Sequence, residues 1–290
     1  MTRATSTVVD VAGFLLLVGA AVAVIVNGAA VEQASVEDPA AERAELLTTS
    51  TASVEYALVV PGSPPNWTAN PTATHQRTAH GTLAELLAEA AMSRVSYEGH
   101  RLSKAGSGFE QAVATATRNR LHERGRRTAV RARWEPYRGA PLNATVRVGE
   151  RPPPGADVDA ATTTVASPAP AVGERARWAA SQGGYTAVAA VVAGAVVDGL
   201  FPPQQTQLAL DGDYPADRLM TRRYDRMAAL TRGGQLSVES TPTNELNTRL
   251  TERLTGRFRR DMRSRFDSPE AAARAVDTGN VTIAVRTWEP

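Results

Sequence analysis

The residues that could carry chemistry in this chain are few and widely spaced. The chain of 290 residues has four histidines, and its closest pair, His75 and His80, is five residues apart, which is the wrong spacing for one helical face. It has no cysteine. A disulfide framework, a thiolate zinc site, an iron–sulfur cluster and a cysteine nucleophile are therefore excluded.

The glycine-containing motifs do not match a known catalytic or phosphate-binding pattern. Gly106-Ser107-Gly108 is not a GxSxG elbow, and no GxxxxGK[ST] or GxGxxG motif occurs. Asp211-Gly212-Asp213 offers two acids, too few for a calcium loop, and predicts a turn. We therefore expect no enzyme activity, no metal and no cofactor. An exported enzyme with an unrecognised site is a third alternative behind the two non-enzymatic functions described below.

The basic charge consists almost entirely of arginine. Lys104 is the only lysine among 32 basic residues, and 30 acidic residues leave a net charge of +2. This near balance predicts no nucleic-acid partner. Two interpretations of the arginines stay open. They reflect a GC-rich genome, or they recognise phosphates or carboxylates.

An apolar run near the N-terminus predicts the location of the protein. Residues 11–31 contain no charged side chain, and their 21 residues match the roughly 20 needed to cross a bilayer as a helix. Arg3 precedes the run, and five acidic residues with one arginine follow it within 32–45. Because basic flanks stay cytoplasmic, we expect a single-pass protein of the cell membrane with a cytoplasmic N-terminus and an extracellular ectodomain.

Three interpretations of this segment compete. It is a permanent anchor, a cleaved secretory signal with Gly28 and Ala30 at the cleavage site, or a pilin-type signal cut before the apolar run. The very short leader, residues 1–10, favours the third. Asp10 places a carboxylate at the mouth of the apolar helix, where it is either solvated by headgroups or paired with a partner.

The segment Arg3-Ala4-Thr5-Ser6 and the apolar run after it resemble the N-termini of haloarchaeal pilin-like proteins. Those proteins share an R-[AG]-x-S leader that leads directly into the hydrophobic helix, and their families are associated with type IV pilus or type II secretion-like machinery. The resemblance implies processing at Arg3, Ala4 and Thr5. It also implies that Asp10 pairs with the freed amino group of a neighbouring subunit during assembly.

The resemblance implies a membrane-anchored, non-enzymatic pilin-like or pseudopilin-like subunit of an archaeal surface appendage or secretion apparatus. Its partners would be the lipid bilayer and other pilin-like subunits, bound through the N-terminal helix. A signal-anchored cell-surface binding protein that does not polymerise is the alternative. Three Asn-x-Ser/Thr sequons, at Asn66, Asn143 and Asn280, follow the apolar run. We expect them to be glycosylation sites, which agrees with export of this part of the chain.

The predicted ectodomain is α+β and divides into two parts, 32–149 and 174–290. A Pro/Ala/Thr-rich stretch between them, 150–173, is expected to be a linker or a long loop. Residues 178–197 are free of charge, which indicates either a second membrane span or, as we favour, a buried helix of the core.

Hydrophobic periodicity predicts the main elements of both parts. Strands are expected at 53–60, 128–134, 144–148 and 281–287, and helices at 82–97, 107–123 and 244–266. Ser268-Pro269-Glu270 marks the start of another helix. Because each part runs helix, helix, strand and ends in Trp-Glu-Pro, we hypothesise two duplicated units that superpose.

Overall fold

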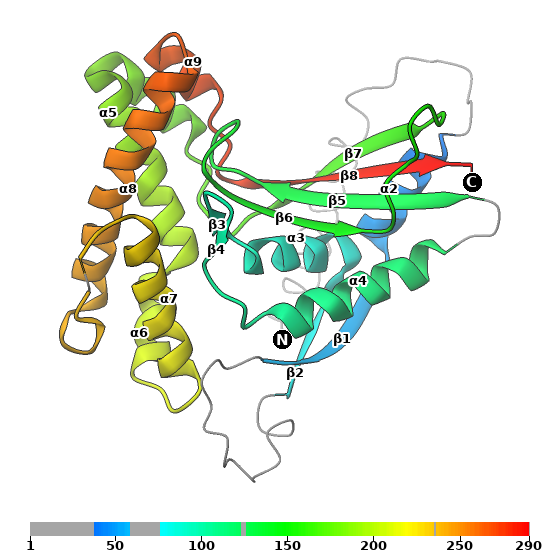
Figure 1. The fold of residues 1–290 in the computed structure, drawn as a ribbon, viewed down its shortest axis with the longest axis horizontal. Helices are drawn as coiled ribbons and strands as arrows, with labels where there is room; N and C mark the ends of the chain where they lie inside the picture. Colours follow the sequence, from blue (N-terminus) through cyan, green and yellow to red (C-terminus); the bar gives the residue numbers. More distant parts are fainter. Residues whose placement is uncertain (1–37, 59–75, 123–125, 235, 290) are drawn as a thin grey trace, which may run out of the picture. The chain divides into compact units, whose positions relative to one another are not determined.

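The computed structural model describes residues 38–58, 76–122, 126–234 and 236–289. The leader 1–10 and the apolar run 11–31 lie outside the described residues. Pro39–Pro290 form one compact unit that combines helices with antiparallel sheets (Figure 1). The predicted α+β class is therefore confirmed.

A six-stranded antiparallel sheet runs through this unit, with strand order β4-β3-β6-β5-β8-β7. Its strands are β3 (Ser96–Tyr97), β4 (His100–Arg101), β5 (Arg127–Trp134), β6 (Leu142–Val148), β7 (Asp159–Ala166) and β8 (Asn280–Trp288). A separate two-stranded sheet pairs β1 (Thr51–Ala57) with β2 (Gln76–Thr82). The predicted strands at 53–60, 128–134, 144–148 and 281–287 correspond to β1, β5, β6 and β8.

One face of the large sheet forms the core with three helices. These are α2 (Pro39–Thr49), α3 (Leu83–Ser93) and α4 (Ser107–Leu121), all of which lie on the same side of the sheet (Figure 1). Alternate residues of the central strands, such as Val130, Ile283 and Val285, point into this layer and are buried. The residues between them face the other way and are half-buried or exposed. This alternation is the usual pattern for a sheet that is covered on one face.

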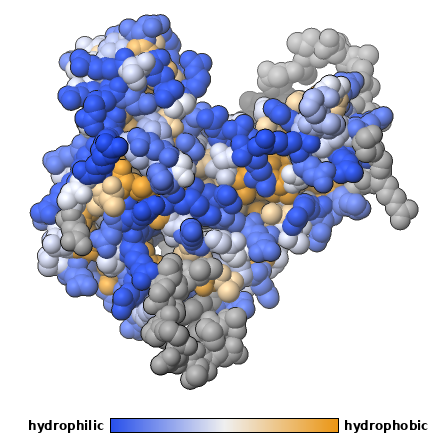
Figure 2. Space-filling model, viewed as in Figure 1, coloured by the Kyte–Doolittle hydropathy of each residue, from blue (hydrophilic) through white to orange (hydrophobic). Residues whose placement is uncertain are grey.

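The remaining helices form an arm at one end of the sheet (Figure 1). They are α5 (Gly173–Leu200), α6 (Pro203–Leu210), α7 (Ala216–Leu230), α8 (Thr243–Arg265) and α9 (Pro269–Arg274), with a short 3₁₀ helix at Val238–Ser240. The helix predicted at 244–266 corresponds to α8, and its apolar residues at every fourth position, Leu246, Leu250, Leu254, Phe258 and Met262, form a fully buried stripe. Figure 2 shows mostly hydrophilic side chains on the visible face, with an apolar patch between the sheet and the helices beneath it.

Helix α5 is, among the described residues, the one helix long and apolar enough to cross a membrane. Half of its most apolar stretch is buried, and the helix packs along α8 and α9. The helix is broken at Gly183 and Gly184, and the φ of 58° at Gly184 is a left-handed value that suits glycine. The apolar part after the break, 185–200, is shorter than the roughly 20 residues of a span. The packing supports our interpretation of 178–197 as a core helix.

The prediction of a linker or long loop at 150–173 is wrong for its central part. Residues Asp159–Ala166 form β7, which pairs along its whole length with β8. The sequence obscures this strand because alanine and threonine replace large apolar residues at its inward positions Ala161 and Thr163. An edge strand with such small side chains depends on backbone pairing for its stability. Residues on both sides of 150–173 belong to the same compact unit.

The two proposed helix-helix-strand units do not have the same arrangement. The helices before β5, α3 and α4, pack on the sheet, whereas those before β8, α8 and α9, pack on α5. Trp134 and Trp288 are both buried, but they lie at opposite ends of the paired strands β5 and β8. The hypothesis of a structural duplication is therefore wrong.

Two leucine-to-alanine substitutions, one at a buried and one at an exposed position, test the buried stripe of α8. We expect Leu254→Ala to lower the free energy of unfolding by about 2–5 kcal/mol, because it opens a cavity at a fully buried position. Leu208→Ala on α6 is the matched control, because Leu208 is 74% exposed, and its change should stay within about 0.5 kcal/mol. Urea unfolding of the full chain in a non-ionic detergent, followed by tryptophan fluorescence, measures both. Equal losses would contradict the described packing.

Candidate functional site

Most of the site residues predicted from the sequence cannot be placed. The processing residues Arg3, Ala4 and Thr5, the assembly residue Asp10 and the sequon residue Asn66 lie outside the described residues. Asn143 and Asn280 are described, and the structure places them at different depths.

Asn143 and Asn280 differ in their exposure. Asn143 lies within β6, between β3 and β5, is half-buried, and its Nδ2 donates to the carbonyl of Ala140 at 3.3 Å. Asn280 is the first residue of β8 and is exposed, and its Nδ2 donates to the Asp277 carboxylate at 2.8 Å. Only Asn280 of this pair has the open surroundings that a bulky glycan needs.

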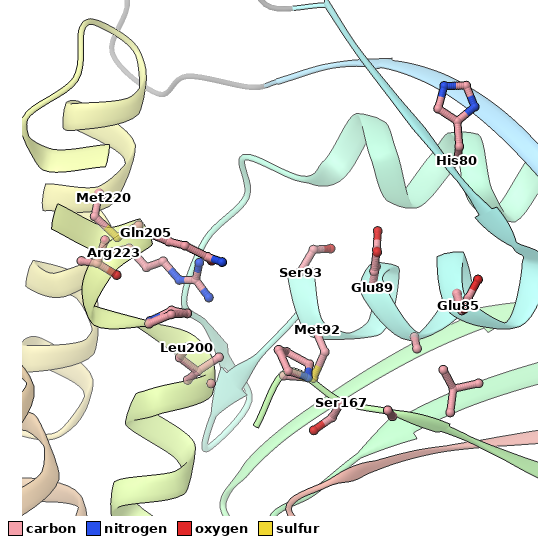
Figure 3. A pocket seen from close by; sticks show the side chains of 17 residues that line it. His80, Glu85, Glu89, Met92, Ser93, Ser167, Leu200, Gln205, Met220 and Arg223 are labelled. Atoms are coloured by element: carbon pink, nitrogen blue, oxygen red, sulfur yellow. The ribbon is translucent and has the colours of Figure 1, made fainter. Parts of the chain in front are cut away.

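The structure also contains a cleft that no sequence motif indicated. This cleft has a volume of about 770 Å³ and lies between α3, the segment after β7, and the start of the arm around α6 and α7 (Figure 3). Met92, Leu200 and Met220 supply apolar surface. A volume and lining of this kind suit a small organic ligand.

Arg223 on α7 supplies the positive charge of the cleft. Its guanidinium group lies over the ring of Phe201, 5.4 Å from the centroid, and points into the cleft beside Gln205 (Figure 3). Burial lowers the pKa of Arg223, and its Nε has no hydrogen-bond partner among the described residues. Within the described part of the chain no carboxylate lies at ion-pair distance from it.

The neighbouring residue fixes the position of Arg223. Tyr224 is fully buried, and its ring stacks on that of Phe201 with the centroids 4.3 Å apart. The Tyr224 hydroxyl donates to Asn247 on α8 at 2.6 Å, and Asn247 donates to the Phe201 carbonyl at 2.8 Å. These contacts hold α7 against the end of α5, and Arg223, the residue directly before Tyr224, lines the cleft.

Helix α3 forms the opposite wall. Glu85 closes the capping box at its start, with the Thr82 amide donating to its carboxylate at 2.8 Å. Glu89, one turn later, has its pKa raised, first by desolvation at the cleft and then by repulsion from Glu85. The Ser93 hydroxyl lies 2.9 Å from both the Glu110 carboxylate and the Ala90 carbonyl, and its one hydrogen is shared between these two acceptors. The wall is therefore acidic and hydrogen-bonded.

Glu110 anchors this wall from behind. Its carboxylate is 6% exposed and pairs with Arg94 at 2.8 Å and with Arg101. Three elements, α3, β4 and α4, meet at this one carboxylate. The two arginines and Ser93 thus satisfy a buried charge, as a buried carboxylate requires.

The arrangement suits binding of a small molecule with an acidic group. Such a ligand would place its acid on Arg223 and its apolar part against Met92, Leu200 and Met220. His80 lies on β2, exposed, at the far end of the cleft (Figure 3). In the described ranges no group of three His, Asp or Glu residues could hold a metal ion.

The sequence contains no signal that singles out the residues of this cleft. Arg223 sits beside Met220 and Tyr224 on an amphipathic helix, where a flanking arginine is ordinary. Glu89 and Ser93 likewise occupy unremarkable positions of α3. Only the tertiary structure, which places α3 across the cleft from the arm, brings them to one site.

Comparison with known proteins adds a family but no activity. The profile of a family of unknown function, DUF7284, matches residues 9–288. No curated protein and no protein of solved structure matches the chain.

The raised pKa of Glu89 predicts a pH-dependent effect of Glu89→Gln. A carboxyl group whose pKa is higher in the folded than in the unfolded state favours folding most at pH values below the unfolded pKa, where it is protonated. This contribution is lost as the pH rises through the folded pKa, because the charged carboxylate is disfavoured in the folded protein. We therefore expect Glu89→Gln to raise the urea midpoint at about pH 7 and to change it little at about pH 3.5. Glu252→Gln on the exposed side of α8 is the control, with a change within about 0.5 kcal/mol at both pH values. A lower midpoint for Glu89→Gln at pH 7 would mean that Glu89 is an ion-pair partner.

Proposed function

We propose that this chain, which belongs to the family of unknown function DUF7284, is a membrane-anchored, non-enzymatic pilin-like or pseudopilin-like subunit. The subunit would be part of an archaeal surface appendage or secretion apparatus. One observation carries the proposal, namely the charge-free run 11–31 directly behind a short leader that carries Arg3 and ends at Asp10. A run of this length fits one crossing of a bilayer.

The extent of the family match supports a retained rather than a discarded segment. The match begins at residue 9 and includes the whole apolar run together with the folded unit. The family therefore has this segment in common, as expected if it is part of the working protein. Only residues 32–38 separate the run from the compact unit that starts at Pro39.

The proposed topology follows from the charges. Arg3 would keep the N-terminus in the cytoplasm, and residues 39–290 would lie outside the cell. The bilayer and other pilin-like subunits would be the partners of segment 11–31. Asn66, Asn143 and Asn280 would then all lie outside the cell, and of the two described positions only Asn280 is exposed enough for a glycan.

The alternative is a signal-anchored surface binding protein that does not polymerise. The cleft beside Arg223 favours it, because a volume of about 770 Å³ beside a guanidinium whose Nε has no partner among the described residues suits ligand binding. Both functions share the anchor, and they differ in processing and in assembly.

N-terminal mass spectrometry of the membrane-associated mature protein separates the two functions. Cleavage next to Arg3 and Ala4 gives a chain that starts at Thr5 or Ser6 and retains the apolar helix, which is the expected result. A start near Val31 would mean an ordinary secretory signal and would overturn the proposal. An uncut N-terminus would favour the binding protein.

The proposed role of Asp10 gives a second test. We expect Asp10→Asn to leave the protein in the membrane fraction but to abolish most of the cross-linking between copies, because the neutral amide cannot form an ion pair with the α-ammonium group of a neighbour. Thr7→Ala, in the same leader, is the control and should cross-link as the unaltered chain does. Undiminished cross-linking of Asp10→Asn would contradict the assembly role.

A further inference from the structure

Four arginines surround a hollow on the open face of the large sheet, opposite to α2, α3 and α4. Arg131 comes from β5, Arg147 from β6, Arg286 from β8, and Arg151 from the loop after β6. The hollow has a volume of about 370 Å³. We call it the arginine hollow and define it by these four residues.

The strand register explains both the walls and the floor of the arginine hollow. Arg131 lies directly opposite Arg147 on β6 and opposite Ala284 on β8, while Ala129 lies opposite Arg286. The arginines therefore stand around small side chains instead of packing on large ones. Like charges at directly opposed positions destabilise a sheet, so this arrangement is unfavourable for folding alone.

The environment of Arg131 shows this repulsion. Burial lowers the pKa of its guanidinium, and Arg133, Arg147 and Arg286 lower it further. Its Nε is buried and has no hydrogen-bond partner among the described residues. An anion beside a guanidinium that is surrounded by other cations and incompletely hydrogen-bonded would stabilise its charge and supply the missing hydrogen-bond acceptor.

The acidic residues near the hollow are already engaged. Glu150 accepts from Arg127 at 2.7 Å, and Glu135 pairs with Arg133 and accepts from the Gly139 amide. Within the described ranges of the chain, no carboxylate lies at ion-pair distance from any arginine of the hollow. The four arginines of the hollow are therefore without an ion pair among the described residues, and only Glu150 at the rim and Glu135 near Arg131 offset part of their charge.

A glycine allows the loop with Arg151 to approach the sheet. Gly149 has a φ of 84°, and a Cβ at this position would lie 2.2 Å from the carbonyl oxygen of Thr128 on β5. The chain can make this close turn only without a side chain. The turn brings Glu150 and Arg151 to the rim of the hollow.

We propose that the arginine hollow binds a multiply charged oxyanion of the phosphate class, carried by a small soluble ligand. Planar guanidinium groups bind phosphate oxygens in pairs, and cations from three strands and a loop suit a di- or trianion better than a single carboxylate. The volume lies within the range of small-ligand sites. This inference does not depend on the proposed anchor or on polymerisation.

Inorganic pyrophosphate is the probe for the test, titrated by calorimetry into the full chain in a non-ionic detergent. We expect binding of one pyrophosphate per chain, and we expect Arg147→Gln to weaken it by about tenfold, as for the loss of one charge-assisted contact. The same substitution should raise or preserve the urea midpoint, because it removes a like charge opposite Arg131. A role that is merely structural would lower the midpoint instead.

Arg175→Gln on α5 is the matched control, because it removes one exposed arginine that does not line the hollow. It should change pyrophosphate affinity by less than about twofold. If Arg147→Gln fails to fold, Arg286→Gln takes its place with the same expectation. Three outcomes would each overturn the proposal. The first is no binding of pyrophosphate by the unaltered chain, and the second is equal weakening by Arg147→Gln and Arg175→Gln. The third is tighter binding of a short oligonucleotide whose affinity is unchanged by Arg147→Gln.

Discussion

Backbone pairing between β5 and β8 is the constraint on which the rest of the structure depends. It joins Arg127–Arg133 to Thr282–Trp288, near the C-terminal end of the chain, and so closes the longest loop of the sheet. Among the described strands, β7 pairs with β8 alone, and β6 pairs with β5 and the short β3. The Trp134 indole donates to the Thr278 carbonyl at 2.8 Å, which fastens the end of β5 to the turn before β8.

The same turn connects the sheet to the arm. The Thr278 hydroxyl donates to the Pro170 carbonyl and accepts from the Val172 amide, so the chain entering α5 is fixed against the chain entering β8. Helix α5 then packs along α8 through the buried stripe of that helix. The cleft at Arg223 lies where this arm meets α3. Its shape therefore depends on the junction as much as on its own lining residues.

Local patterns predicted the elements whose stability is mainly local. The helix at 244–266, the helix start at Ser268 and the strands at 128–134 and 144–148, which pair as β5 and β6, were all predicted correctly. Strand β7 was not, since its small inward residues give no periodic signal and its partner lies over a hundred residues away. Helices α6 and α7 were also missed. Their apolar surface is limited, because α6 buries only Thr206 and α7 buries Tyr224, Met227 and Ala228.

The sequence by itself determined the charge-free run 11–31, the absence of cysteine chemistry and the amphipathic stripe of α8, since each is a property of neighbouring residues along the chain. It also showed the excess of arginine, without indicating where the arginines meet. Only the tertiary structure placed Arg131, Arg147 and Arg286 together and set Arg223 over Phe201. The physical reason is that strand register and helix packing bring together residues from distant segments, and no spacing within one segment encodes that proximity.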